Sequence, residues 1–192
     1  MTTAQIITAV RYHLQETTEL RYFDAQILQV ANEAQNDIVQ RARPEWFPAL
    51  LEEISGTLAA AGTVALPADF LFPIAVQYGA SALNAPIIMP TSPLYPRLIN
   101  ADPFVGGTSS LPKATVVDGL LRCYPAGAVA YKLTYLKLPP DMVSAGQAPT
   151  IPASMHGMIV DYATAQVLMS DDDPRNAADY LAAYEARVQE LK

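Results

Sequence analysis

The spacing of apolar residues differs between the ends and the middle of this chain, and this difference limits its fold more than any other feature. Residues 1–49 and 151–192 carry apolar side chains at intervals of three and four, as helices with one buried face do. Residues 50–150 carry short apolar runs broken by proline and by turn residues, which favours strands. The sequence therefore predicts an α+β fold, in which both chain ends form a bundle of about four helices around an inserted antiparallel β domain.

Capping residues and prolines mark the ends of the predicted helices. Thr2 or Thr3 can cap a first helix, and Asp24 stands where a second helix needs its N-cap. Pro44 ends that second helix, and Pro152 lies in the first turn of a third, where its missing N–H costs nothing. A fourth helix closes the chain. Its apolar seam, which can pack within the chain or on another subunit, consists of Ala177, Leu181, Tyr184, Val188 and Leu191.

Turn residues give the clearest signals in the middle of the chain. The pair Asp118-Gly119 between two apolar runs predicts a β-hairpin, because a type I′ turn needs positive φ at both central residues. Residues 129–135 alternate between apolar and polar as a half-buried strand does, and we expect them to extend the hairpin into a three-stranded meander. Residues 70–78 also alternate, but Pro73 makes this an edge strand or a bulged strand.

Composition and charge narrow the range of functions. Charged residues make up only 16% of the chain, against about 25% in ordinary soluble domains. A surface with so little charge, and with ten tyrosines, suits burial by other subunits. The net charge of −7 opposes wrapping by nucleic acid, because phosphates repel an acidic surface.

The residue types that carry catalysis do not converge in this sequence. His13 and His156 stand alone on predicted helices, and Cys123 lies in a predicted strand as a buried, inert thiol. The run 171–173 of three aspartates lacks the alternate spacing of a metal loop, so we interpret it as a helix cap. We therefore predict no enzyme activity, no cofactor and no metal site.

The compartment follows from cysteine use and from the start of the chain. Cys123 has no second cysteine to pair with, which favours a reducing compartment. Residues 1–5 lack the basic start and apolar run of a signal peptide, and no stretch of about 18 apolar residues exists. We expect neither secretion by a cleaved leader nor insertion into a membrane.

Several segments in a fixed order resemble one known family. Trp46 follows Pro44, and the segments 63–70 (TVALPADF), 117–125 (VDGLLRCYP) and 131–135 (YKLTY) come next. Ile151-Pro152 then precedes the closing helix pair. No single segment is diagnostic, but their conjunction over nearly the whole chain resembles the head-tail adaptor (connector, tail tubular protein A-like) proteins of short-tailed bacteriophages.

This resemblance implies a structural virion protein. Its members form a ring, here expected to be dodecameric, that links the portal protein to the tail nozzle protein and lines the DNA channel with only passive contact with DNA. The resemblance further implies that the helical bundle faces the portal and the β part faces the nozzle. The protein would be made in the bacterial cytoplasm and would lie at the head–tail junction of the virion, on the path of genome ejection.

Two segments are the expected partner interfaces. A proline-rich surface excursion should meet a neighbouring subunit or the nozzle through Leu94, Tyr95, Arg97, Leu98 and Phe104. The last helix should make helix contacts through Tyr180, Leu181, Tyr184, Val188 and Leu191. Two alternatives stay open from the residues alone: a carbohydrate-binding or adhesin-like β module, which would use the aromatic residues, and, less favoured, a hydrolase.

Overall fold

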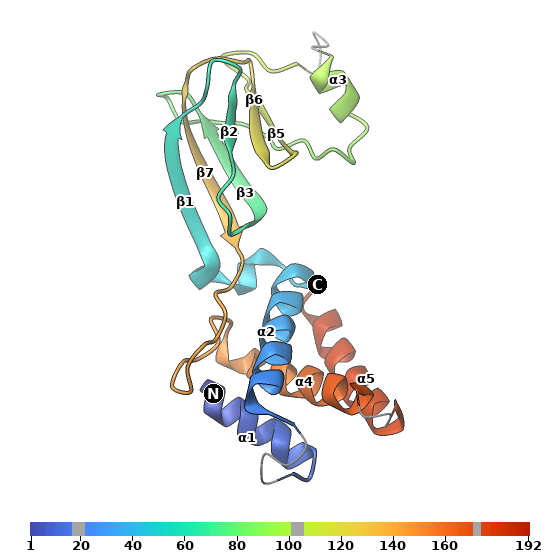
Figure 1. Cartoon of the computed structure of the whole chain (residues 1–192). Helices are drawn as coiled ribbons and strands as arrows, with labels where there is room; N and C mark the ends of the chain where they lie inside the picture. The colour runs from blue at the N-terminus through green and yellow to red at the C-terminus, as the bar shows by residue number, and fades with distance from the viewer. Residues whose placement is uncertain (17–21, 101–105, 171–173) are drawn as a thin grey trace. The chain divides into compact units, whose positions relative to one another are not determined.

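The computed structural model describes residues 1–16, 22–100, 106–170 and 174–192 (Figure 1). The chain divides into two compact units, which we call the helical unit (Met1–Leu50 and Leu138–Lys192) and the β unit (Leu51–Lys137). The α+β fold expected from the sequence is confirmed, because helices from both chain ends pack together and two antiparallel sheets are inserted between them. The sequence analysis places residues 138–150 in the β region, but in the structure they belong to the helical unit.

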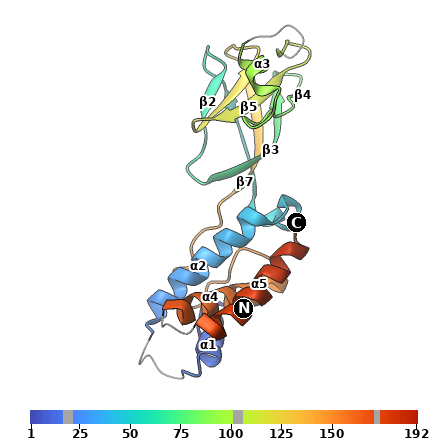
Figure 2. The same ribbon diagram turned by 90° about the vertical axis from the view of Figure 1, so that its right-hand side faces the viewer.

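The helical unit contains α1 (Thr3–His13), α2 (Asp24–Arg41), α4 (His156–Ser170) and α5 (Pro174–Glu190). Short 3-10 helices lie at Pro44–Trp46, Pro48–Leu50 and Ala153–Met155. Helix α4 packs against α1, α2 and α5 (Figures 1 and 2). It buries the consecutive residues Met158, Ile159 and Val160, and a helix that is apolar on several sides belongs in the centre of a core.

The starts of α1 and α2 differ in how well the sequence predicted them. Thr2 is the N-cap of α1, where its backbone N–H donates to the Gln5 side chain (2.8 Å) while its hydroxyl accepts from the Gln5 N–H (3.4 Å). The prediction that Asp24 caps α2 is wrong: Phe23 is the N-cap and Asp24 is the first helical residue. The Asp24 carboxylate instead accepts a hydrogen bond from Arg11 (2.7 Å), which holds it toward α1.

The β unit is built from two antiparallel sheets. The first has the order β1 (Leu51–Thr57), β7 (Ala130–Lys137), β3 (Phe70–Tyr78) and β4 (Leu83–Asn84). The second has the order β2 (Thr63–Ala65), β6 (Leu120–Tyr124) and β5 (Lys113–Val117). One apolar core holds side chains from both sheets, among them Val76, Leu121, Leu133 and Tyr135.

The hairpin prediction is confirmed, and the meander prediction is wrong. Asp118 and Gly119 both have positive φ, 53° and 71°, and they join β5 to β6. However, β7 does not pair with β6; it pairs with β1 and β3 in the other sheet. Apolar alternation shows which face of a strand is buried, but it does not show which strand lies beside it. The chain therefore changes sheets between Tyr124 and Ala130, where a meander would have stayed in one sheet.

Strand β3 is bulged, as Pro73 predicted. Its register with β7 shifts between Phe70 and Phe72 and again between Pro73 and Ala75. On its other side, β4 pairs only with Gln77 and Tyr78. The chain then enters the proline-rich excursion, which contains the short helix α3 (Tyr95–Ile99).

Candidate partner-binding surfaces

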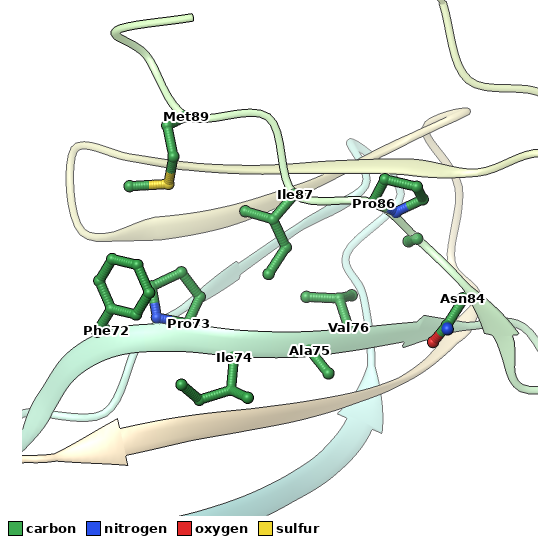
Figure 3. Close-up of a pocket in the computed structure, with 10 residues that line it drawn as sticks. Phe72, Pro73, Ile74, Ala75, Val76, Asn84, Pro86, Ile87 and Met89 are labelled. Atoms are coloured by element: carbon green, nitrogen blue, oxygen red, sulfur yellow. The ribbon is translucent and has the colours of Figure 1, made fainter. Parts of the chain in front are cut away.

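An apolar groove runs along the edge of β3 in the β unit. Its volume is about 410 Å³, and it lies between β3 and the segment 84–89. We call this concavity the β3 groove. The described residues that line it are Phe72, Pro73, Ile74, Ala75, Val76, Asn84, Ala85, Pro86, Ile87 and Met89 (Figure 3). Asn84 is the one polar side chain among them, and none carries a charge.

The groove exists because strand pairing stops partway along β3. The Ala85 N–H donates to the Val76 carbonyl (2.9 Å), and the chain then leaves β3 for the other sheet. There the Ala114 N–H donates to the Pro86 carbonyl (3.0 Å), and the Ile88 N–H donates to the Ala114 carbonyl (2.8 Å). No described strand therefore pairs with residues 70–75 on the side away from β7.

The side chains of the groove divide into a floor and a rim. Pro73 and Val76 are buried, and Val76 faces Ile87 across the groove (Figure 3). Phe72 and Ile74 are 45% and 38% exposed. Exposed large apolar residues beside an uncharged concavity favour burial by another protein surface, because that burial removes apolar area from water.

The expected interface residues of the excursion have different surroundings. Leu94 is 43% exposed and Arg97 is exposed. Leu98 is fully buried and packs with Ile88 and Tyr95 under α3, so it holds the helix in place rather than facing a partner. Phe104 lies outside the described residues.

The expected interface residues of α5 are also divided. Tyr184 and Val188 are fully buried in the helical unit, so they make their helix contacts within the chain and are not available to a partner. The Tyr184 ring contacts Tyr162 of α4 edge-on, with centroids 5.0 Å apart. Tyr180, Leu181 and Leu191 are partly exposed.

A polar network fixes α5 on α2. The Tyr184 hydroxyl donates to the Asp37 carboxylate, and burial beside that carboxylate raises the pKa of Tyr184. Arg41 donates to Asp37 (3.1 Å) and to Glu185 (2.8 Å), and this pairing holds the pKa of Glu185 below its usual value. These contacts explain why the seam of α5 faces its own chain.

The two histidines are hydrogen-bonded within the chain, and the cysteine is packed in a core. His156 is buried, its Nδ1 lies 2.7 Å from the Met1 amino group, and its Nε2 lies 3.0 Å from the Ile151 carbonyl. Burial lowers the pKa of His156 and raises the pKa of the Cys123 thiol to about 12. His13 is exposed and hydrogen-bonds Tyr180 (3.2 Å). Among the described residues no group of three possible metal ligands gathers, and the run 171–173 lies outside them.

The β3 groove was missed by the sequence analysis, although part of its signal was visible. Pro73 indicated an edge strand or a bulged strand, and the apolar residues Phe72 and Ile74 stand on either side of it. The opposite wall comes from Pro86, Ile87 and Met89, whose return to β3 depends on contacts far along the chain. Only a knowledge of strand pairing could have placed the two walls together.

No helix in the described part of the chain has the length and apolar character needed to cross a membrane.

Comparison with known proteins identifies the family. No curated protein matches the sequence. A family model described as SU10 adaptor protein matches residues 1–192. The chain therefore belongs to the SU10 adaptor protein family, and its resemblance to phage head-tail adaptors is confirmed.

Proposed function

We propose that this protein is a structural component of a phage virion that forms a ring between the portal protein and the tail nozzle protein. The observation that carries the proposal is the match of the SU10 adaptor family over residues 1–192. The ring is dodecameric, lies at the head–tail junction and lines the channel through which DNA passes. The protein is made in the host bacterial cytoplasm and joins the virion during assembly.

The distribution of charge supports a channel that DNA passes without binding. The β unit carries five acidic and five basic residues, whereas the helical unit carries fourteen acidic and seven basic residues. The whole net charge of −7 thus belongs to the helical unit. An acidic surface repels phosphates and gains nothing from counterion release, so contact with DNA is passive.

The role is mechanical and needs neither catalysis nor a cofactor. Three groups that could carry chemistry are engaged in packing or hydrogen bonding: His156 beside Met1, Cys123 in the β core, and Tyr184 on Asp37. Cys123 in particular keeps its proton at neutral pH, because burial raises its pKa to about 12.

Two exposed segments are proposed contacts with other virion proteins. Leu94, Tyr95 and Arg97 lie on or beside α3 in the β unit, and they suit a contact with the nozzle or with a neighbouring subunit. Tyr180 and Leu181 are partly exposed on α5, and with Leu191 they suit a contact on the helical side. Three other residues that the sequence analysis expected at an interface, Leu98, Tyr184 and Val188, are buried. They support these surfaces from beneath and are not part of them.

A sedimentation experiment tests the proposed function. Purified protein is mixed with tailless capsids of the cognate phage that carry the portal, and the mixture is pelleted and imaged in negative stain. We expect the protein to pellet and to add a ring of density below the portal. Capsids that lack the portal are the control. Protein that stays in the supernatant with both kinds of capsid would refute the proposal.

A further inference from the structure

Strand β1 forms an open edge of the larger sheet. It has seven residues, contains no proline, and pairs in regular register with β7 along its whole length. No described strand pairs with its other side. An edge of this kind presents unpaired N–H and C=O groups and is a template for another strand.

The two charged residues of β1, which could keep another strand away from this edge, already form ion pairs within the sheet. Glu52 and Glu53 could repel an incoming strand, but the Lys137 ammonium lies 2.6 Å from Glu52 and the Lys132 ammonium lies 2.8 Å from Glu53. Both lysines belong to β7, so the two carboxylates are neutralised on the inner side of β1. An approaching uncharged surface therefore meets no unpaired charge among these residues.

The opposite end of the same sheet offers a complementary surface. There β3 is uncovered over residues 70–75, and the apolar β3 groove lies beside it. Pro73 has no N–H to donate, and the bulge after it interrupts the register. A strand that docks at this edge is therefore held by apolar burial in the groove together with a few backbone hydrogen bonds, and not by a complete ladder.

We infer, on the basis of the proposed ring function, that β1 of one copy docks along the uncovered edge of β3 in the next copy, beside the β3 groove. A ring requires each subunit to present two different surfaces that fit each other, and the two ends of this sheet are such a pair. The exposed Leu51 brings an apolar side chain, and Ser55 and Gly56 let the backbones approach closely. The β unit has no net charge, so two β units do not repel each other through net charge.

A contact between two identical edges fits these observations less well. Pairing of β1 with β1 would close a dimer and leave the β3 groove facing water with Phe72 and Ile74 exposed. Head-to-tail pairing covers both edges in every copy except those at the ends of an open chain. A closed ring has no such ends.

Cysteine cross-linking tests the contact. Ser55 lies near the middle of β1 and Ile74 lies near the middle of the uncovered part of β3, and both are exposed. The variant Ser55→Cys/Ile74→Cys is bound to portal-bearing capsids, treated with a short bis-maleimide, and separated on a denaturing gel. We expect a ladder that rises from the dimer. The single variants Ser55→Cys and Ile74→Cys are matched controls and should stay monomeric, because Cys123 is buried.

Each outcome of this experiment supports or overturns the inference. Capsid-bound double variant without a ladder would overturn it, and so would dimers formed by Ser55→Cys alone, which show pairing of identical edges. Failure to bind the capsids would instead count against the proposed function. The same cross-linking, carried out on concentrated free protein, then still decides the contact by the same criteria.

A charge placed in the groove provides an independent test. Ile74→Asp puts a carboxylate on the rim, where docking would bury it without a partner, so we expect loss of ring formation. Val143→Asp is the matched control, because Val143 is 79% exposed and belongs to the helical unit and to neither strand edge. Circular dichroism melting of both variants checks that they fold. A folded Ile74→Asp variant that forms rings as well as Val143→Asp would contradict the inference.

Discussion

The hydroxyl of Tyr184 donates a hydrogen bond to the carboxylate of Asp37, two residues that are 147 positions apart in the sequence. This bond joins the last helix of the chain to the second, and the ring of the same Tyr184 contacts Tyr162 edge-on. The seam of α5 is therefore part of the core of a single subunit. This packing holds the partly exposed residues of the same helix in place.

Removing the Tyr184 hydroxyl should weaken the helical unit. Tyr184→Phe keeps the ring and deletes a part-buried hydrogen bond to a charged group, so we expect a loss of about 1 to 2 kcal/mol in the free energy of unfolding. Urea unfolding followed by the fluorescence of Trp46, the single tryptophan of the chain, measures it. Tyr12→Phe is the control, since Tyr12 is 79% exposed. Equal stability of the two variants would show that the Tyr184 bond contributes nothing.

Arg11 should stabilise the connection from α1 to α2. Its side chain is only 10% exposed and donates to the Asp24 carboxylate (2.7 Å) and the Tyr22 carbonyl (2.8 Å). Arg11→Met would leave these acceptors without their donor, and we expect a loss of about 2 kcal/mol. Lys132→Met, which breaks an exposed pair with Glu53, should cost less than about 1 kcal/mol. The prediction fails if the two substitutions have the same effect on urea unfolding.

The stability of the helical unit should fall as the pH falls below about 6.5, the ordinary pKa of histidine. Burial holds the pKa of His156 below that value in the folded state, so between the two pKa values the unfolded chain binds a proton that the folded chain does not. The contribution of neutral His156 is fully present above pH 6.5 and is lost as pH falls through the folded pKa. For one group the slope is at most about 1.4 kcal/mol per pH unit.

Two histidine variants separate this effect from other titrations. His156→Gln should have a flatter dependence of unfolding free energy on pH than the parent protein. His13→Gln is the matched control, a histidine substitution at an exposed position. Thermal melting between pH 7 and pH 5 provides the measurement, and a parent slope retained in His156→Gln would rule out His156 as its source.

Cys123 should not react with thiol reagents in the folded protein. It is 1% exposed, and burial raises its pKa to about 12, so almost no thiolate forms at pH 8. We expect labelling by a chromogenic disulfide only after urea unfolds the β unit. Rapid labelling without urea would show that this core opens readily, and it would also require replacement of Cys123 before the cross-linking test.

The turn between β5 and β6 should depend on glycine for its backbone alone. Gly119 has a φ of 71°, and a Cβ built there meets nothing within 4 Å. Gly119→Ala should therefore cost about 1 kcal/mol through the left-handed conformation and not through a clash. Gly146→Ala, with equal space and no positive φ, lies in the helical unit and should be close to neutral in urea unfolding followed by Trp46 fluorescence. The urea dependence of Cys123 labelling measures the stability of the β unit. Equal stability of Gly119→Ala and the parent protein would contradict the prediction.

Local signals in the sequence predicted the elements of this fold well. The Thr2 cap, the Asp118-Gly119 turn and the bulge near Pro73 each depend on a few neighbouring residues, and the structure confirms all three. Local signals failed where a distant residue decides. Asp24 looks like a cap in the sequence, but Arg11 on another helix holds its carboxylate.

The pairing of strands and the candidate surfaces could not be predicted for the same reason. The alternation of 129–135 predicted a strand, but its neighbours β1 and β3 come from much earlier in the chain. The β3 groove needs Ile87 to lie opposite Val76, which no local pattern shows. In the helices, periodicity predicted that Tyr184 and Val188 share a face, but not that their own chain covers it.

The chain enters and leaves the inserted β unit at one place, since Leu51 at the start of β1 stands opposite Leu136, one residue before the end of β7. A polypeptide that departs from a scaffold and comes back at one spot can be exchanged for another insert without lengthening either connection. Selection could thus replace the strands to suit a different tail while leaving the helices that carry them unchanged. Engineers could do the same, by swapping this segment for a reporter or for a short linker between positions 50 and 138.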